Sequence, residues 1–536
     1  MPNALGSLEP PAPLLRALTD RDHATLPQLL RARVARTPDS VFLLAGAARW
    51  TYAAAWTEIL RFATFLRASG IKPGERVASY LTNRPECLWS WFGTLGAGAV
   101  YVPLNRNHRG QLLREVAERS QAHMLVTDAA GLAELLAAQV PLDGRRVLLV
   151  DTSSADLRPA PEPFPRTSPV FDVEADARPD DLAMLVFTSG TTGRSKAVRL
   201  PHNMYCRGAD ALVQALDLRS NDVFHLWLPL FHIAGQLHAT VSTIVAGGAI
   251  ALFPTFSRSR FWREVAECRA TFCAGLPNML QLLLSAPARP DDALNTLRVV
   301  IAAGAGPDLV RDFSHRFDVQ PRDTYGMTEV EPLTLPTPAM PAGSCGVVGR
   351  DFEIAIVDAE DRPLSAAARG HIVMRPRVPG VMMLGYEDDD AATLASSRNL
   401  WFHTGDLGYR DEDGFIYLAG REKQMIRRGG ENISAFELEA LIAQHPAIAA
   451  VVVVGVRTQP GDEEVKAVVV ARADMTLDPR QIHRYCRDRM ARFMVPRFID
   501  IRDRLPCSEL GKVQREELAR TTAGSWDAQE EGLNAR

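Results

Sequence analysis

The residues with the most evident chemistry lie between 186 and 196, where an apolar run gives way to hydroxyl side chains, glycines and a lysine. The apolar residues 182–187 predict a buried strand. Glycines let the backbone after it turn tightly and point its N–H groups at an anion, and Lys196 adds a full positive charge. The pattern indicates a phosphate-binding loop, although it lacks the spacing of a Walker A motif and, taken alone, is also typical of a surface loop. The candidate ligand groups are Thr188, Ser189, Gly190, Thr191, Thr192 and Lys196.

A second candidate stretch reads Asp-Thr-Tyr-Gly-Met-Thr-Glu over residues 323–329. The ring of Tyr325 suits stacking on a purine, and Thr328 can donate a hydrogen bond to an α-phosphate oxygen. Glu329 is a hard oxygen ligand, and Mg²⁺ usually binds one or two carboxylates beside substrate phosphates. Taken alone, the same residues are typical of a turn that enters a helix with an acidic first turn. The loop at 188–196 makes the nucleotide interpretation the stronger one.

Other stretches gain meaning only in combination. Residues 299–307 predict a strand that runs into a turn of small residues, where a planar group can approach the backbone. His232, Asp406 and Lys512 are, one at a time, typical of a helix-start histidine, a turn aspartate and a solvated surface lysine. Their order along the chain, relative to the first two stretches, is what gives them a functional interpretation.

The elements that must position these residues alternate along the chain. A helix is predicted from Thr25 and another from residues 50–52, with apolar strands between the helices. Strands that alternate with helices imply βαβ units and largely parallel sheets. Beyond residue 421, a run of roughly a hundred residues has the size of a small α+β domain. The predicted strands include 76–81, 100–104, 123–127, 146–150, 182–187, 450–456 and 465–470.

Taken together and in this order, these motifs resemble the adenylate-forming superfamily of acyl-CoA synthetases, luciferases and peptide-synthetase adenylation domains. The resemblance covers about residues 25–520 and looks closest to bacterial acyl-CoA ligases, including the carnitine-CoA ligase-like and secondary-metabolite branches. Ser195 stands where the family usually has proline, and Ala197 where it usually has glycine. The resemblance implies an α/β fold: a large N-terminal domain of parallel and mixed sheets with helices plus a distorted barrel, and a small mobile α+β C-terminal domain.

The resemblance also implies a role for each matching residue. Lys512, Thr188, Glu329 and His232 take catalytic positions, with Glu329 as the metal ligand and His232 as a gate of the acyl pocket and thiol tunnel. Lys423 becomes the hinge, and coenzyme A passes residues Gly429, Gly430 and Glu431. ATP and AMP are bound by Thr188, Ser189, Gly190, Thr191, Thr192, Lys196, Gly304, Ala305, Asp323, Thr324, Tyr325, Gly326, Thr328, Asp406, Arg421 and Lys512.

The expected organisation has four parts. Residues 1–24 form an N-terminal extension, 25–421 the large domain, 422–520 the small domain, and 521–536 a disordered polar tail. Net charge is −4, so nothing points to nucleic acid, and no apolar run reaches the ~18 residues of a membrane span. The seven cysteines lack C-x-x-C spacing, which suits a reducing cytoplasm. A homodimer is left open.

The implied function is that of an ATP-dependent acyl-CoA synthetase that uses ATP, Mg²⁺ and coenzyme A. A carboxylic acid attacks the α-phosphorus of ATP, pyrophosphate leaves, and the thiol of coenzyme A then displaces AMP. The pocket walls expected around residues 272–279, 302–306 and 327–332 are mostly small or apolar, which favours an apolar or bulky acid. The alternatives are an enzyme that loads a carrier protein, a variant that uses a ready-made adenylate, and a catalytically inactive binding relative.

Overall fold

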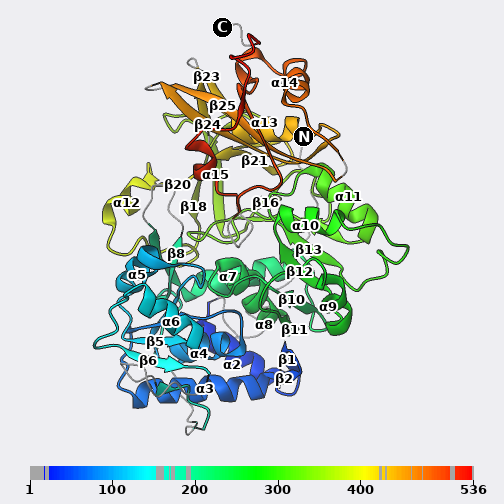
Figure 1. Cartoon of the computed structure of the whole chain (residues 1–536). Helices are drawn as coiled ribbons and strands as arrows, with labels where there is room; N and C mark the ends of the chain where they lie inside the picture. The colour runs from blue at the N-terminus through cyan, green and yellow to red at the C-terminus, as the bar shows by residue number, and fades with distance from the viewer. Residues whose placement is uncertain are drawn as a thin grey trace, which may run out of the picture. The chain divides into compact units, whose positions relative to one another are not determined.

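The structure is a computed structural model that divides into two compact units (Figure 1). Unit 1 comprises Met1–Glu353 and Pro376–Ser396, and unit 2 comprises Ile354–Arg375 and Ser397–Arg536. Each unit is described by itself. The described residues are 17, 23–151, 162–167, 170, 176–188, 195–421, 425–428, 431–459, 462–473, 475–507 and 513–533.

Unit 1 contains two seven-stranded sheets, and both are parallel except at one edge. The antiparallel edge pairs are β1–β2 in the first sheet and β8–β9 in the second. In order, the first sheet runs β14 (Gln320–Arg322), β13 (Val299–Ala302), β12 (Phe272–Gly275), β10 (Val223–Leu226), β11 (Ala249–Leu252), β1 (Val41–Ala45) and β2 (Ala48–Thr51). The second runs β7 (Glu162–Pro163), β6 (Arg146–Leu149), β5 (Met124–Thr127), β3 (Arg76–Tyr80), β4 (Val100–Pro103), β8 (Leu182–Thr188) and β9 (Lys196–Pro201).

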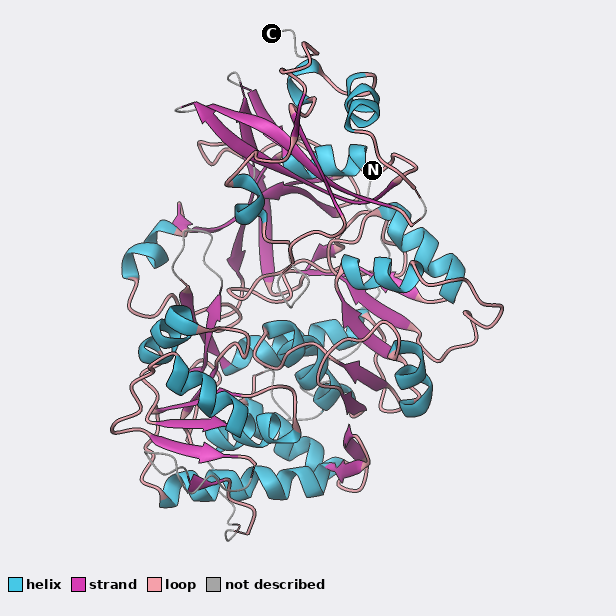
Figure 2. Ribbon diagram, viewed as in Figure 1, coloured by secondary structure: helices cyan, strands magenta, loops and turns pink. Residues whose placement is uncertain are grey.

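Helices connect and cover these strands, as Figure 2 shows. The first elements are α2 (Leu26–Arg36), α3 (Tyr52–Ala68), α4 (Pro85–Gly96), α5 (Gly110–Arg119), α6 (Ala129–Ala137) and α7 (His202–Ala215). They are followed by the π-helix η1 (Ala234–Val241), α8 (Ser242–Ala246), α9 (Phe261–Cys268), α10 (Pro277–Leu284), α11 (Pro307–Phe317) and α12 (Asp390–Ala395). The predicted parallel α/β architecture is therefore confirmed.

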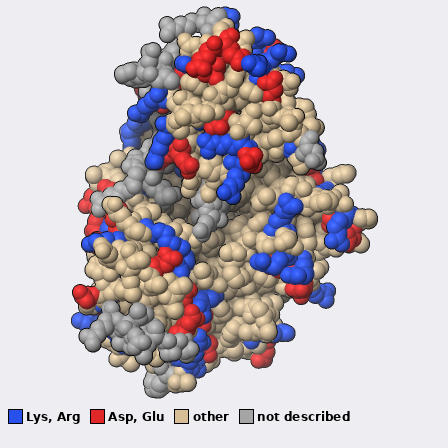
Figure 3. Space-filling model, in the orientation of Figure 1, with Lys and Arg blue, Asp and Glu red and all other residues tan. Residues whose placement is uncertain are grey.

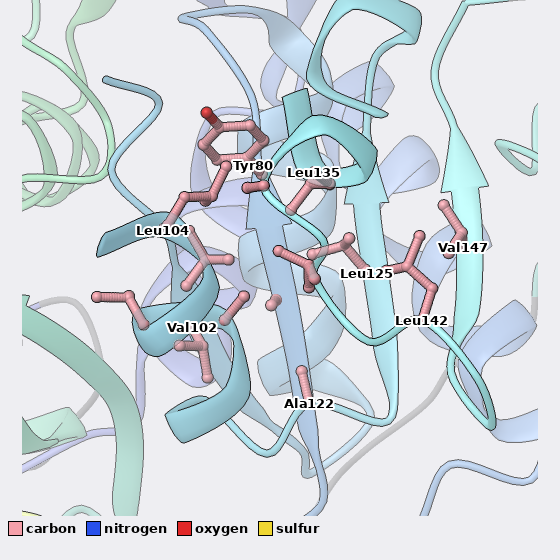
Figure 4. Packing of buried hydrophobic residues seen from close by; sticks show 14 of the residues in the cluster. Tyr80, Val102, Leu104, Ala122, Leu125, Leu135, Leu142 and Val147 are labelled. Atoms are coloured by element: carbon pink, nitrogen blue, oxygen red, sulfur yellow. The ribbon is translucent and has the colours of Figure 1, made fainter. Parts of the chain in front are cut away.

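Both faces of the second sheet are buried. Successive residues of its strands point to opposite faces, and the side chains on both faces are apolar. Tyr80 and Val102 point into the cluster that α5 and α6 cover, together with Leu125 and Leu135 (Figure 4). Tyr101, one residue from Val102, points the other way and stacks on Trp91 of α4 at 6.3 Å between ring centroids. A parallel sheet covered on both faces requires near-continuous apolar strands, and this is why the strands of this sheet were readable from the sequence.

The first two described helices begin at capping residues. Thr25 caps α2 in a reciprocal capping box with Gln28, and Thr51 caps α3 by accepting the N–H of Ala54. A capping hydroxyl satisfies one of the backbone N–H groups that have no partner within the helix. These starts agree with the helices predicted from residues 25 and 50–52.

Unit 2 carries a five-stranded sheet in place of the expected barrel. Among the residues that the structure describes, this sheet is open rather than closed, because β17, β19 and β21 each pair on one side only. The distorted barrel is thus a correction to the expected fold. The strands are β17 (Phe352–Val357), β18 (Gly370–Pro376), β19 (Ser397–Arg398), β20 (Trp401–Arg410) and β21 (Ile416–Arg421).

The rest of unit 2 packs helices on a mixed four-stranded sheet. In this sheet β24–β25 and β26–β27 are antiparallel and β25–β26 is parallel. Apolar residues of the strands and of the helices α13 and α14 share one buried cluster. The elements are β22 (Met425–Arg428), β23 (Glu431–Ser434), α13 (Ala435–Ile442), β24 (Ile448–Gln459), β25 (Asp462–Ala471), α14 (Pro479–Arg487), the 3₁₀ turn η3 (Arg492–Met494), β26 (Phe498–Arg502), α15 (Arg515–Ala519) and β27 (Trp526–Asp527).

The tail expected to be disordered is ordered where the structure describes it, over residues 521–533. Its strand β27 pairs with β26, and Asp527 accepts a charged hydrogen bond from Arg497 at 2.9 Å. The polar composition of the tail gave no indication of the short edge strand β27, because its partner β26 lies at a distance in the sequence. The expected hinge at Lys423 lies outside the described residues, so the boundary at 421–422 stays a prediction.

The described helices were compared with the length and apolar character of a membrane span. No described helix combines the length and the apolar character that a bilayer crossing requires. In Figure 3, acidic and basic side chains are interspersed over the visible face, in keeping with a net charge of −4.

A small two-stranded sheet, β15 (Thr334–Leu335) with β16 (Val347–Val348), completes unit 1.

Candidate active site

The candidate phosphate loop is the connection of an antiparallel hairpin at the edge of the second sheet. Thr188 is the last residue of β8, and Lys196 is the first of β9. The two residues are cross-strand partners, and the hydroxyl of Thr188 donates to the carbonyl oxygen of Lys196 at 3.4 Å. The hairpin therefore holds the two predicted ends of the loop side by side. Ser189, Gly190, Thr191 and Thr192 lie outside the described residues.

Thr328 and Glu329 form the corner of a tight turn. The backbone groups of Met327 and Val330 exchange two hydrogen bonds, both of 2.9 Å, so the two residues between them project from a closed two-residue loop. The alternative interpretation of this stretch as a helix start is wrong. The backbone carbonyl of Glu329 also accepts the N–H of Met383 at 2.8 Å, which ties the turn to a segment that the sequence did not single out.

That segment brings Tyr386 between the turn and the hairpin. The Tyr386 hydroxyl donates to Oε1 of Glu329 at 2.8 Å. The ammonium nitrogen of Lys196 lies 4.2 Å from the centroid of the Tyr386 ring, over its face, where a cation is attracted by the π electrons. Burial, together with the adjacent Glu329 carboxylate, raises the pKa of the Tyr386 phenol above its usual value, so it remains a hydrogen-bond donor.

Asp323 fixes the small-residue turn that follows β13. Each of its two carboxylate oxygens lies 3.0 Å from the backbone N–H of Gly304, which adopts a left-handed φ of 76°. Ala305, the next residue, is buried. Burial raises the pKa of the Asp323 carboxyl to about 7, although the N–H groups of Gly304 and Thr324 oppose this shift. The two predicted adenine-loop residues and Asp323 therefore belong to one local structure.

The residues between Asp323 and the tight turn are held from several sides. The Thr324 hydroxyl donates to the carbonyl of Thr334 at 2.6 Å, and the N–H of Tyr325 donates to the hydroxyl of Thr334 at 2.9 Å. Tyr325 itself is buried. A Cβ at Gly326 would lie 2.6 Å from the carboxylate of Glu331, so only glycine fits there without a shift.

In unit 2, Asp406 and Arg421 face each other across neighbouring strands. They are register partners in the β20–β21 pair, and Nε of Arg421 lies 2.9 Å from a carboxylate oxygen of Asp406. Asp406 is buried, and its N–H donates to the hydroxyl of Thr404 at 3.1 Å. The predicted ribose ligands thus form one ion pair, and their role in binding stays a prediction.

His232 lies at the start of the η1 region and is exposed. Its Nδ1 accepts the N–H of Ala234 at 3.2 Å. Among the expected pocket walls, the side chain of Met279 lies over Gly275, because a Cβ at Gly275 would come within 2.3 Å of it. The role of His232 as a gate is not tested by this arrangement.

Several predicted residues fall outside the described part of the chain. These are Lys512, the hinge residue Lys423, Gly429 and Gly430. Glu431 begins β23 with its backbone paired to Arg428, and its side chain is not described. Their predicted roles therefore rest on the sequence.

The residues at this site fit a magnesium ion that is coordinated mainly by the phosphates of the substrate and by one carboxylate, that of Glu329. Within the described residues, no cluster of three His, Cys, Asp or Glu side chains could hold a metal by itself. Glu329 uses Oε1 for the Tyr386 hydroxyl, and among the described residues its other oxygen has no hydrogen-bond partner, so that it can face a cation. Mg²⁺ is commonly held by one or two carboxylates and the phosphates of its nucleotide, so a single carboxylate suffices.

Tyr386 is the residue that reasoning from the sequence missed. It lies in Leu-Gly-Tyr over residues 384–386, directly before the acidic run 387–390, and neither pattern by itself indicates a nucleotide site. Its partner Glu329 is 57 residues away along the chain. Its importance follows from the tertiary contacts alone.

Comparison with known sequences matches the chain to two profiles of AMP-binding enzymes. The profile of AMP-binding enzymes matches residues 30–387, and the profile of the AMP-binding enzyme C-terminal domain matches residues 437–512. A crotonobetaine/carnitine–CoA ligase of Salmonella agona strain SL483 is 34% identical over 493 residues, which cover 88% of this chain and 93% of the relative.

Solved structures extend the likeness to the fold. ATP-bound MatB from Rhodopseudomonas palustris has a TM-score of 0.81 and 26% identity, and the match covers 95% of this chain and 98% of that one. The O-succinylbenzoate coenzyme A synthetase MenE from Bacillus subtilis, in complex with AMP, has a TM-score of 0.79 at 25% identity, with coverage of 94% and 100%. The anthranilate CoA ligase AuaEII with anthranoyl-AMP, at 23% identity and a TM-score of 0.85, covers 93% and 97% and is similar in fold.

Proposed function

Because this chain belongs to the AMP-binding enzyme family, we propose that it is an ATP-dependent acyl-CoA ligase that forms an acyl-adenylate. The observation that carries the proposal is the grouping in unit 1 of the Thr188–Lys196 hairpin end and the Glu329 turn through Tyr386. A cation, a hydroxyl and a metal-binding carboxylate are the groups that a triphosphate requires. The relatives named as CoA ligases support the same reaction class.

In the first half-reaction, a carboxylate oxygen of the acid attacks the α-phosphorus of ATP. A bond forms between that oxygen and phosphorus, the bond to the β-phosphate oxygen breaks, and pyrophosphate leaves. Such a reaction asks the protein for positioning and charge stabilisation rather than covalent work. Lys196 and Thr188 would hold the phosphates from the hairpin, and Lys512 would neutralise charge on the carboxylate and α-phosphate.

Glu329 would hold Mg²⁺ through the oxygen that Tyr386 leaves unused. The ion, when bound, supplies positive charge to the phosphates. The Gly304–Ala305 turn, fixed by Asp323, would receive the adenine, and the Asp406–Arg421 pair would bind the ribose.

In the second half-reaction, the thiol of coenzyme A attacks the acyl carbon and AMP leaves. The small domain would turn about Lys423, withdraw Lys512 and present Gly429, Gly430 and Glu431 to the pantetheine arm. Domain movements of this kind commonly limit turnover. A carrier-protein thiol in place of coenzyme A is the second candidate acceptor.

The acid is proposed to be apolar or bulky. The strands that would line its pocket, β12 and β13, read Phe-Cys-Ala-Gly and Val-Val-Ile-Ala, with no charged side chain. Crotonobetaine and carnitine, which the name of the Salmonella relative mentions, carry a quaternary ammonium that favours carboxylates or aromatic faces. Both therefore belong in any substrate screen as contrasting acids.

The proposed setting is cytoplasmic. None of the seven cysteines, all of which the structure describes, forms a disulfide, which suits a reducing compartment.

The test is a pyrophosphate-release screen of the purified full chain with ATP and fatty, aryl, polycyclic and betaine-type acids. We expect release with at least one acid and, once coenzyme A is added, matching release of AMP. Pyrophosphate release with AMP release only upon addition of a phosphopantetheinylated carrier would select the carrier loader. No ATP consumption with any acid would refute the proposed function.

A further inference from the structure

Tyr386 lies where three segments of unit 1 meet. Its hydroxyl contacts Glu329 of the tight turn at 2.8 Å, and its ring carries the ammonium of Lys196 at 4.2 Å from the ring centroid. The structure shows no ion pair between Lys196 and Glu329 in the described part of the chain. The tyrosine therefore stands between a cation and an anion that would otherwise attract each other.

The backbone on both sides of Tyr386 is fixed to β9 and to the turn. Arg199 of β9 accepts the N–H of Leu384 at 2.8 Å and donates to the carbonyl of Gly385 at 3.0 Å. Past the tyrosine, the N–H of Glu387 donates to the carbonyl of Ala197 at 2.8 Å. Tyr386 has 6% of its surface exposed, and its own N–H donates to the hydroxyl of Thr393 at 2.9 Å.

This rigidity decides what the side chain can do. A donor that is fixed in place selects one oxygen of a carboxylate and so sets the rotation of that carboxylate. Partners of this kind behind a metal ligand typically change metal affinity 10–100-fold when they are removed. The ring face can at the same time hold an ammonium without neutralising it, since the cation–π attraction leaves the charge intact.

We propose that Tyr386 is a positioning residue for adenylate formation, which orients Glu329 toward the metal through its hydroxyl and presents Lys196 to the phosphates through its ring. The proposal rests on the proposed function, because it assumes that Glu329 and Lys196 serve Mg·ATP. It adds a residue that takes part in both tasks and touches neither the metal nor the nucleotide.

Two substitutions separate the two tasks. Tyr386→Phe removes the hydroxyl and keeps the ring, whereas Tyr386→Leu removes both. Tyr417→Phe is the matched control, because Tyr417 also donates to a carboxylate, that of Asp411 at 3.0 Å, in the turn of the β20–β21 hairpin. Thermal unfolding establishes that each variant is folded.

The readout is binding rather than turnover. Mn²⁺, a stand-in for Mg²⁺, is titrated by electron paramagnetic resonance at saturating α,β-methylene-ATP, and ATP binding without metal is measured by calorimetry in EDTA. For Tyr386→Phe we expect Mn²⁺ affinity to fall about tenfold or more with metal-free ATP affinity unchanged. For Tyr386→Leu we expect both affinities to fall, the second by about twofold to fivefold.

Unchanged or tighter Mn²⁺ binding in Tyr386→Phe would overturn the role of the hydroxyl. Equal metal-free ATP affinity in Tyr386→Leu and in wild type would overturn the role of the ring. If neither Tyr386 variant folds, Lys196→Met takes their place. It should lower metal-free ATP affinity and leave Mn²⁺ affinity at saturating nucleotide unchanged, and any other result contradicts the separation of tasks. Failure of the wild type to bind ATP would refute the proposed function instead.

Discussion

At the scale of single residues, the site depends on side chains whose protonation and orientation are set by burial. Asp323 is the clearest case, since it is buried and its carboxylate accepts hydrogen bonds from backbone N–H groups. Residue types such as Glu329 and Thr328 were predictable because their chemistry shows in the sequence. The environment of Asp323 and the very presence of Tyr386 in the site were not, because both depend on partners brought together by folding.

Replacement of Asp323 by asparagine should alter how stability depends on pH. Burial raises the pKa of its carboxyl from 3.8 to about 7, so the folded state holds a proton that the unfolded state releases between about pH 4 and pH 7. The free energy of unfolding then falls as pH rises through this range. In Asp323→Asn we expect a smaller loss of stability between pH 5 and pH 8, measured by urea unfolding. Asp312→Asn, on the exposed face of α11, should keep the wild-type profile, and an unchanged profile in Asp323→Asn would contradict the prediction.

At the scale of elements, local signals and distant pairing contribute differently. The capped helices α2 and α3 and the apolar strands of the second sheet were readable because caps and apolar runs are local. The tight turn at 327–330 and the pairing of Thr188 with Lys196 were not, because both are closed by backbone hydrogen bonds that no side-chain pattern indicates. The edge strand β27 was not, because its partner β26 lies elsewhere in the sequence. The open sheet of unit 2 likewise follows from which edges pair, which composition does not reveal.

A substitution at Gly326 tests whether the tight turn depends on the close packing of Gly326 against Glu331. A Cβ there would lie 2.6 Å from the Glu331 carboxylate, which His238 holds with a 2.9 Å contact. Gly326→Ala should therefore cost about 1–3 kcal/mol of stability and raise the KM for ATP. Gly306→Ala is the control for stability, because a Cβ at Gly306 meets nothing within 4 Å. Equal stability of the two variants would show that the turn can relax.

At the scale of the whole molecule, the proposed cycle needs two units with separate tasks. The described nucleotide-binding candidates divide between them, with Lys196, Glu329 and Asp323 in unit 1 and Asp406 with Arg421 in unit 2. The family match explains why an ordered set of motifs could be assigned from the sequence over most of the chain. The acid substrate could not be assigned from the sequence. Small and apolar pocket walls disfavour charged acids, but they do not select one particular apolar acid.

Lys512→Ala should separate the two half-reactions. We expect it to abolish pyrophosphate release, because the ammonium would meet charge that develops on the α-phosphate, and to spare thioester formation from supplied acyl-adenylate. Rapid-quench assays of each half-reaction measure this. An equal loss in both would contradict a role confined to adenylation.

Lys423→Pro should have the opposite effect. A proline removes a backbone N–H and fixes φ, so a hinge at this position would turn poorly. Pyrophosphate release should persist while transfer to coenzyme A falls steeply, as thiol-dependent AMP release would show. Normal transfer in this variant would move the hinge elsewhere.

The pairing of Thr188 with Lys196 has a consequence for the segment between them. Bringing the ends of a chain segment together costs entropy, and here the ladder of β8 and β9 meets that cost during folding rather than on ligand binding. Binding of a triphosphate by Thr188 and Lys196 would therefore not require these two residues to be brought together first. Of the two unusual residues nearby, Ser195 ends this segment and Ala197 lies in β9 as the partner of Phe187, so the ladder of β8 and β9 fixes the backbone at Ala197.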